Sequence, residues 1–373
     1  MKHSLLRCVA FLFCLCVFPA LPLLEKPVRF PSFLSVERTS WPKLRWSQNA
    51  RTEGGPSATE TEPFLTLSVP ESTPKIPTEN ASPTLPSRYL ILDSDTGKLL
   101  RLTPTEYLLG VTAAEMPASY EPEALKAQAV AAHSYALWQM GVQLSAPDPA
   151  LKGAFLSTDP ARFQAYLSQA ARRELWGADF AFCEEKLRAA VEAVTGLVLT
   201  RDGKPVAAAF HALSSGRTEA AEDVWGQSIP CLVSVESPWD TASPDQIKTK
   251  TFSREEAAAI LSAKLKDPEL GGDPRRWITV QTRSEGGSVL HARAAGAEVS
   301  GRDLREWFGL PSTVFSINWD GETFRFTVRG KGHGVGMSQY GANAMAGEGS
   351  DFSQILRHYY PGAELTQVAV AGR

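Results

Sequence analysis

The alternation of apolar and polar residues becomes regular only after Arg88, where short stretches of period two predict β-strands. Residues 89–92 and 98–102 are expected to form one strand pair around a polar turn. Two further pairs flank the tight-turn sequence Asp-Gly, at 202–203 and at 320–321. These strands therefore are predicted to pair mainly as antiparallel hairpins.

Helical periodicity occupies much of the chain between these hairpins. A helix over 104–115 has strong start signals, because Thr103 can serve as N-cap, a proline follows, and Glu106 can complete a capping box. A second helix over 122–140, which Gly141 would stop, carries a face of small alanines that favours close packing. Further helices are expected at 160–171, 182–195, 254–265 and 301–308. Because helices and antiparallel strands are mixed without a strict βαβ order, the predicted fold class is α+β.

The first 87 residues differ from the rest. Lys2, His3 and Arg7 precede an uncharged run over 8–24, so residues 1–25 are expected to be a signal peptide or a transmembrane anchor, and no clear cleavage site favours the anchor. Residues 26–87 mix proline with Ser, Thr and Glu, which predicts a disordered tether. Residues 88–373 form the predicted folded domain, which could divide into two lobes near 240–250.

Composition excludes two classes of protein. The 38 Lys+Arg against 41 Asp+Glu give a net charge of −3, so nothing argues electrostatically for nucleic-acid binding. Three of the five cysteines lie in the first 16 residues, which leaves only Cys183 and Cys231 downstream. A disulfide-rich scaffold is therefore excluded, although these two cysteines could pair if the protein leaves the cytoplasm.

Three segments carry side chains that could do chemistry. Glu115 lies at a predicted helix end between alanines and a proline break, where burial could raise its pKa as a general acid requires; a solvated surface glutamate is the alternative. Residues 210–226 gather His211, serines and carboxylates in one loop, but no nucleophile elbow is present, so a serine hydrolase is disfavoured. Residues 331–342 surround His333 with glycines and predict a tight turn into a helix.

Four motifs together resemble one known family. They are AAEMPAS at 113–119, EALKAQAVAA at 123–132, FHALSSGRTEAAEDVWG at 210–226 and GHGVGMSQYGA at 332–342. They look like the motifs of the stage II sporulation protein D (SpoIID) family, which also includes the LytB amidase enhancers. The resemblance implies a SpoIID/LytB-like domain and a membrane-anchored lytic transglycosylase that cleaves peptidoglycan glycan strands during forespore engulfment.

The same resemblance assigns roles to individual residues. Glu115 would be the catalytic acid/base. Side chains that would contact the sugars, with packing or capping roles as the alternative, are Lys126, Gln128, His133, His211, His333 and Gln339. His133 stands where the family often has an arginine, which replaces a fixed cation with a titratable group. The alternative function is that of a non-catalytic wall-binding enhancer of an N-acetylmuramoyl-L-alanine amidase, as in the LytB branch.

The family resemblance also implies which cofactors and partners to expect. Some family members bind zinc through a segment that corresponds to 157–166, where Ser157, Arg162 and Phe163 here replace the soft ligands, so neither a metal nor another cofactor is expected. The expected partners are peptidoglycan strands, a peptidoglycan amidase, other engulfment proteins and, through the N-terminal segment, a membrane. The expected location is outside the cytoplasm, either membrane-anchored or secreted.

Overall fold

The computed structural model describes residues 87–368. The predicted signal or anchor segment and the predicted tether up to residue 86 lie outside the described residues. Among the described helices, none is long and apolar enough to cross a membrane. The described part mixes helices with mostly antiparallel strands, which confirms the predicted α+β class.

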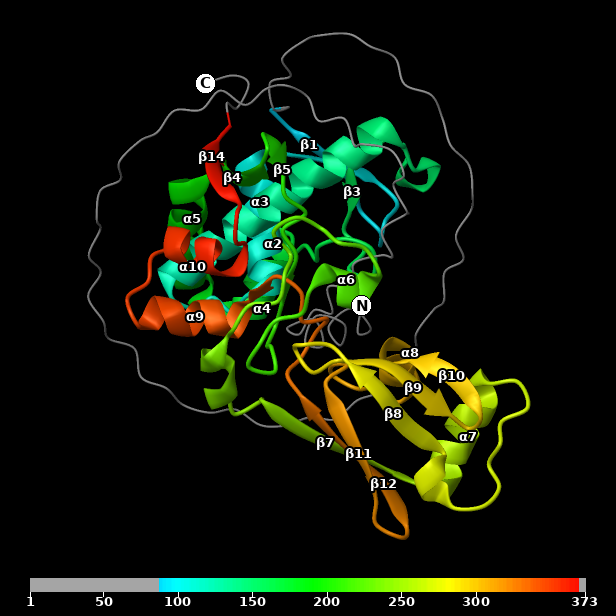
Figure 1. Ribbon diagram of the computed structural model, residues 1–373. Helices are drawn as coiled ribbons and strands as arrows, with labels where there is room; N and C mark the ends of the chain where they lie inside the picture. Colours follow the sequence, from blue (N-terminus) through cyan, green and yellow to red (C-terminus); the bar gives the residue numbers. More distant parts are fainter. Residues whose placement is uncertain (1–86, 369–373) are drawn as a thin grey trace.

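The first hydrophobic core is organised around α3 (Pro122–Ser145), which is buried on nearly every side. Alanines along this helix let neighbouring elements approach closely. The helices that pack against it are α2 (Pro104–Glu115), α5 (Phe180–Val194), α9 (Gln339–Gly347) and α10 (Phe352–Tyr359). Figure 1 shows α3 running through the middle of this helical part.

Small sheets close the first core. The strand order is β2-β1-β3 in one sheet and β14-β4-β5 in another, while β6 and β13 form a short parallel pair. Their bounds are β1 (Tyr89–Leu92), β2 (Leu99–Leu102), β3 (Leu156–Ser157), β4 (Leu197–Arg201), β5 (Lys204–Pro205), β6 (Phe210–His211), β13 (Met337–Ser338) and β14 (Glu364–Gln367). The β6–β13 pair places the motif that contains His211 beside the glycine-rich motif.

A second hydrophobic core is built entirely from residues between β7 and β12. Its sheets have the orders β11-β12-β7 and β10-β9-β8, and Figure 1 shows them with α7 and α8 below the helical part. The bounds are β7 (Ile247–Ser253), α7 (Arg254–Lys264), β8 (Ile278–Arg283), β9 (Val289–Ala294), β10 (Ala297–Ser300), α8 (Gly301–Trp307), β11 (Phe315–Trp319) and β12 (Thr323–Arg329). The chain enters at Ile247 and leaves at Arg329, which are paired in neighbouring strands.

The remaining elements are short. They are α4 (Gln169–Trp176), α6 (Ala221–Trp225) and the 3-10 helices η1 (Pro149–Leu151), η2 (Gly177–Asp179), η3 (Pro238–Ala242) and η4 (Pro274–Arg276). α6 lies within the motif at 210–226, and Figure 1 shows it on the side of the first core that faces the second core.

Features that depend only on neighbouring residues were predicted correctly from the sequence. The capping box at the start of α2 is present, with the Thr103 hydroxyl accepting from the Glu106 N–H and the Glu106 carboxylate accepting from the Thr103 N–H. Both Asp-Gly sequences lie in hairpin turns, and Asp202 adopts the left-handed conformation with a φ of 51°.

Two helix predictions were wrong, both because tertiary contacts overrode local signals. α3 continues through Gly141 to Ser145, since Val142 in that last turn is buried. The helix predicted over 160–171 is absent, and α4 begins only at Gln169. Residues 163–167 instead run irregularly across α2, where their backbone and side chains bond to α2 residues.

Close contact between this irregular segment and α2 predicts the effect of Gly110→Ala. A Cβ at Gly110 would lie 2.1 Å from the Tyr166 ring and 2.9 Å from the Leu167 carbonyl, so the variant should lose about 1–3 kcal/mol of unfolding free energy. Gly347→Ala is the matched control, because the same change in α9 meets nothing within 4 Å and should be neutral or stabilising. Equal urea midpoints for the two variants would contradict this packing.

Candidate functional site

Glu115 is the last residue of α2, and its side chain is only 7% exposed. The helix ends there because Met116 is extended, at φ −125° and ψ 141°, and the following Pro117 disfavours a helical Met116. The Glu115 Oε1 accepts a hydrogen bond from the Ala165 N–H at 3.1 Å. The carboxyl group is therefore both buried and oriented by a backbone donor.

Residues 163–167, the covering segment, supply that donor. The segment is held on α2 by the Tyr107 hydroxyl, which donates to Gln164 Oε1 at 2.7 Å, and by the Leu167 N–H, which donates to the Gly110 carbonyl at 3.0 Å. The Tyr107 and Tyr166 rings stack with centroids 6.5 Å apart. These contacts fix the Ala165 N–H relative to Glu115.

A buried ion pair anchors the end of the covering segment. Arg172, only 4% exposed, binds both carboxylate oxygens of Glu184 at 2.8 Å and also donates to the Leu167 carbonyl at 2.8 Å. The bidentate pair and the bond to Leu167 together use three of the five guanidinium N–H donors. The pairing holds the Glu184 pKa below its usual value. α4 and α5 are thereby linked to the backbone beside Glu115.

Gln128 and Gln339 come together although they are far apart in sequence. Gln128 lies on α3 and is fully buried, and Gln339 begins α9. The Gln339 Nε2 donates to Gln128 Oε1 at 3.4 Å, while Gln128 Nε2 has no hydrogen-bond partner among the described residues. The pair therefore joins the motif at 123–132 to the motif at 332–342 and leaves the Gln128 Nε2 donor available at their contact.

His211 and His333 also meet, from β6 and from the glycine-rich loop, with ring centroids 5.8 Å apart. His211 Nδ1–H donates to the Val335 carbonyl at 3.1 Å, whereas His333 Nδ1 accepts from the Val335 N–H at 3.1 Å. Burial lowers the pKa of His211 to about 4 and that of His333 well below its usual value. Both rings are therefore neutral, and the Trp225 ring lies 5.4 Å from His333.

Glycine is required where this loop passes β6. Gly336 has a φ of 73°, and a Cβ there would lie 2.0 Å from the Ala209 carbonyl oxygen. The close approach allows Met337 to pair with Phe210 and brings Gln339 next to the motif that contains His211.

Asp240 joins two of the motifs, and sequence reasoning did not single it out. It is fully buried in the 3-10 helix η3 and accepts hydrogen bonds from the Ser214 N–H at 3.0 Å, from the Ser214 hydroxyl, and from the Ser338 hydroxyl at 2.8 Å. Burial raises its pKa, while these hydrogen bonds oppose that effect. Asp240 lies outside all four motifs, so only the three-dimensional contacts reveal its role.

Two predicted sugar contacts lie in positions that do not suit that role. His133 is fully buried, and both nitrogens are used, since Nε2 accepts from the Tyr89 hydroxyl at 2.8 Å and Nδ1–H donates to the Leu197 carbonyl at 3.2 Å. Burial lowers its pKa to about 4. Lys126 pairs with Glu123 at 2.6 Å beside the Phe352 ring of α10. We therefore interpret both as packing residues.

The segment that could have held zinc carries other contacts here. Arg162 pairs with Asp148 at 2.5 Å, and Phe163 is buried. Within residues 87–368, no three His, Cys, Asp or Glu side chains gather as a metal site would require. Cys183 and Cys231 are free thiols, and burial raises the pKa of both.

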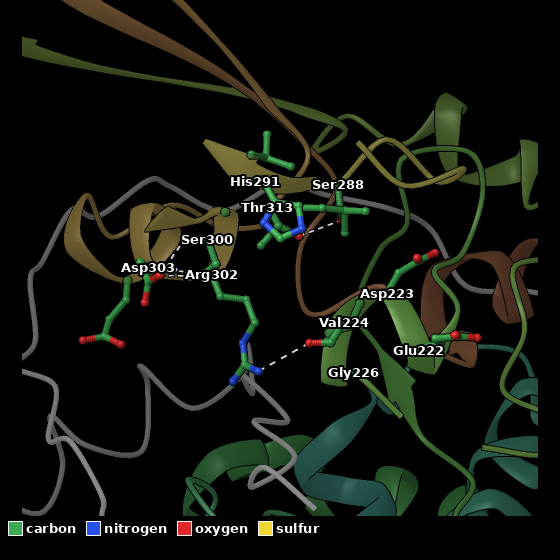
Figure 2. A pocket seen from close by; sticks show the side chains of 14 residues that line it. Glu222, Asp223, Val224, Gly226, Ser288, His291, Ser300, Arg302, Asp303 and Thr313 are labelled. Atoms are coloured by element: carbon green, nitrogen blue, oxygen red, sulfur yellow. Dashed lines mark hydrogen bonds between the residues drawn. The ribbon is translucent and has the colours of Figure 1, made fainter. Parts of the chain in front are cut away.

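A pocket of about 620 Å³ lies between α6 and the second core, as Figure 2 shows. Asp223 and Val224 line it from α6, while Ser288, His291 and Arg302 line it from the second core. Arg302 Nη1 donates to the Val224 carbonyl at 3.4 Å across the pocket. Glu115 is not among the lining residues.

Removal of the Asp240 carboxylate should destabilise the fold. Asp240→Ala leaves the buried Ser214 and Ser338 donors without an acceptor, so we expect a loss of about 3 kcal/mol of unfolding free energy. Asp245→Ala is the control, because that side chain is more than half exposed and its pair with Lys248 should contribute less than about 1 kcal/mol. Urea denaturation that gives the same loss for both variants would contradict this role for Asp240.

Buried neutral histidines predict a loss of stability in acid. The folded pKa values of His133 and His211 are about 4, below the reference value of 6.5, so between these values the unfolded chain binds protons that the folded chain does not. The free energy of unfolding should therefore fall as pH decreases from 6.5 to 4, by up to about 1.4 kcal/mol per pH unit for each histidine.

Denaturation at several pH values checks this expectation. His133→Gln should make the dependence shallower, because it removes one of the buried neutral rings. Equal pH slopes for wild type and His133→Gln would contradict a neutral, buried His133.

Comparisons with known proteins agree with these motifs. The family described as "SpoIID: Stage II sporulation protein" matches residues 93–201, which include Glu115 and Gln128. Stage II sporulation protein D of Bacillus amyloliquefaciens is 39% identical over 293 residues, which cover 78% of this chain and 83% of that protein. Its counterpart in Bacillus subtilis (strain 168) is 42% identical over 262 residues, 70% of this chain and 74% of that protein.

A more distant relative carries a different name. The amidase enhancer of Bacillus subtilis (strain 168) is 29% identical over 307 residues, which cover 69% of this chain and 40% of that protein. The sequence identity to the two sporulation proteins is higher, and each alignment covers most of this chain and most of the relative. This chain therefore belongs to the stage II sporulation protein D (SpoIID) family.

Proposed function

We propose that this protein is a lytic transglycosylase of sporulation. Its substrate would be peptidoglycan glycan strands without stem peptides, cleaved between N-acetylmuramic acid and N-acetylglucosamine to leave 1,6-anhydromuramic ends. Family membership supports the sporulation role, because the relatives with the higher identity are named stage II sporulation protein D. The observation that carries the enzymatic part is the buried Glu115 carboxyl, oriented by the Ala165 N–H.

A single carboxyl group is sufficient for this reaction. Glu115 would donate its proton to the glycosidic oxygen as the bond from C1 to that oxygen breaks. The resulting carboxylate would then accept the proton of the muramic 6-hydroxyl while that oxygen bonds to C1. No water is consumed and Glu115 regains its proton, so a second carboxylate, as in hydrolases, is not needed. The nucleophile belongs to the same sugar, which lowers the entropic barrier.

The buried amides of Gln128 and Gln339 and the buried imidazoles of His211 and His333 are the proposed sugar contacts. Gln128 Nε2 lacks a partner among the described residues, so it can donate to the carbonyl of an N-acetyl group. Gln339 Nε2 donates to Gln128 Oε1 and would thereby fix the orientation of the Gln128 amide. His211 and His333 would act as neutral hydrogen-bonding groups, because burial lowers the pKa of both.

The wider biological setting is proposed on the family resemblance. We expect the protein to act outside the cytoplasm, anchored by its N-terminal segment, during engulfment of the forespore. A peptidoglycan amidase would remove stem peptides first, and other engulfment proteins would be partners. The second candidate function is that of a non-catalytic amidase enhancer, which the similarity to a relative of that name favours.

The test is mass spectrometry of the products released from amidase-treated peptidoglycan. Wild type should generate 1,6-anhydromuramic ends, and Glu115→Gln, which keeps the shape but removes the acidic proton, should reduce turnover by about a hundredfold or more while binding glycan normally. Glu174→Gln is the matched control, since this exposed glutamate lies on α4 and should leave turnover unchanged.

Two outcomes would contradict the proposal. Undiminished turnover by Glu115→Gln would place the acid elsewhere. Glycan binding by wild type without any anhydro products, together with stimulation of an added amidase, would support the enhancer function instead.

A further inference from the structure

Every second residue from 215 to 219, in the loop that precedes α6, contacts one turn of the second core. The turn is residues 284–288, between β8 and β9. The contacts are Ser215 Oγ to the Gly286 carbonyl at 2.7 Å, Arg217 Nη1 to Glu285 Oε1 at 3.0 Å, and the Ser288 N–H to Glu219 Oε1 at 3.1 Å. We call these three residues and the turn the interlobe clasp.

Glu219 is the buried member of the interlobe clasp. Its side chain is 2% exposed, whereas the Arg217–Glu285 pair is partly open to solvent and should contribute little. Glu219 Oε1 accepts from the Ser288 N–H, which also reaches Ser284 Oγ at 2.9 Å, while Glu219 Oε2 has no hydrogen-bond partner among the described residues. Burial raises the pKa of Glu219, which favours the protonated carboxyl.

The backbone of Glu219 reaches the other way, to the glycine-rich loop. Its N–H donates to the Gly334 carbonyl at 2.8 Å, directly after His333 in the chain. One residue thus contacts the loop of the candidate site with its backbone and the turn of the second core with its side chain.

Two glycines make room for this side chain. A Cβ at Gly334 would lie 2.7 Å from Glu219 Cγ, and one at Gly286 would lie 2.4 Å from Glu219 Oε1. The three atoms nearest to a Gly286 Cβ all belong to the Glu219 carboxyl group, and Gly286 does not have a positive φ. The lack of a side chain at 286 is therefore explained by Glu219 rather than by backbone conformation.

We propose that Glu219 is a positioning residue: through its contacts with Ser288 and Gly334 it fixes the second core against the His333 loop and thereby holds the candidate site in its working geometry. The role is geometric and does not require a charge on Glu219. The activity readout of this inference rests on the proposed glycan cleavage, whereas its structural readout does not.

The experiment compares full-length variants in glycan cleavage and in amide hydrogen exchange. Glu219→Ala should lower kcat about tenfold or more, because a small displacement of reacting groups is costly, and should speed exchange in peptides that cover 284–290 and 330–336. Glu219→Gln keeps an acceptor for Ser288 and should stay within about threefold of wild type in both readouts. Glu322→Ala, at the exposed tip of another hairpin, is the control.

Gly286→Ala tests the same contact from the opposite side. On its own it should displace Glu219 and lower kcat, but in the Glu219→Ala background it should add nothing, because the atoms that it would meet are gone. If Glu219→Ala does not fold, the other two variants decide the question. A lowered kcat in Gly286→Ala together with a nearly normal kcat in Glu219→Gln would support the positioning role, and a normal kcat in Gly286→Ala would overturn it.

Three results would overturn the inference. They are normal kcat and exchange in Glu219→Ala, a loss in Glu219→Gln as large as in Glu219→Ala, and additive effects of Gly286→Ala and Glu219→Ala. If wild type itself cleaves no glycan, the proposed function fails, and the exchange rates alone then support or overturn the positioning role.

Discussion

The burial of α3 on nearly every side is the constraint on which the rest of the structure depends. Its alanines, such as Ala127 and Ala131, allow α2, α5 and α9 to approach closely, so residues from distant parts of the chain reach one region. A helix buried on nearly every side needs neighbours on nearly every side. The end of α2 with Glu115 and the start of α9 with Gln339 are both placed by packing on this helix.

Polar contacts inside this packing decide which groups remain for chemistry. His133 and Asp240 are fully buried, and their hydrogen bonds join elements that are far apart in sequence. Satisfied groups of this kind specify a structure, whereas a buried donor without a partner, such as Gln128 Nε2, suggests a place where a ligand completes the bonding. We therefore interpret His133 and Asp240 as residues that hold the fold and propose Gln128 as a residue that contacts the sugars.

Much of the fold could be predicted from sequence because many of its signals are local. The capping box of α2 and the two Asp-Gly turns depend on neighbouring residues only. The covering segment could not be predicted, because its path over α2 depends on Tyr107 and Gly110, more than fifty residues earlier in the chain. For the candidate site, Gln128, Gln339, His211 and His333 were found by motif, and the structure pairs them as neighbours. Asp240 was missed because it lies outside the four motifs. Its partners Ser214 and Ser338 belong to two of those motifs, and only the folded structure brings them to it.

The proposed function requires that Glu115 act directly on the glycosidic bond. A crystal structure of Glu115→Gln with a peptide-free glycan fragment would test this most directly. We expect a glycosidic oxygen within about 3 Å of the side chain at position 115, with the N-acetyl group near Gln128. A glycan bound so that no glycosidic oxygen comes within hydrogen-bond distance of that side chain, for example only in the pocket beside α6, would contradict it.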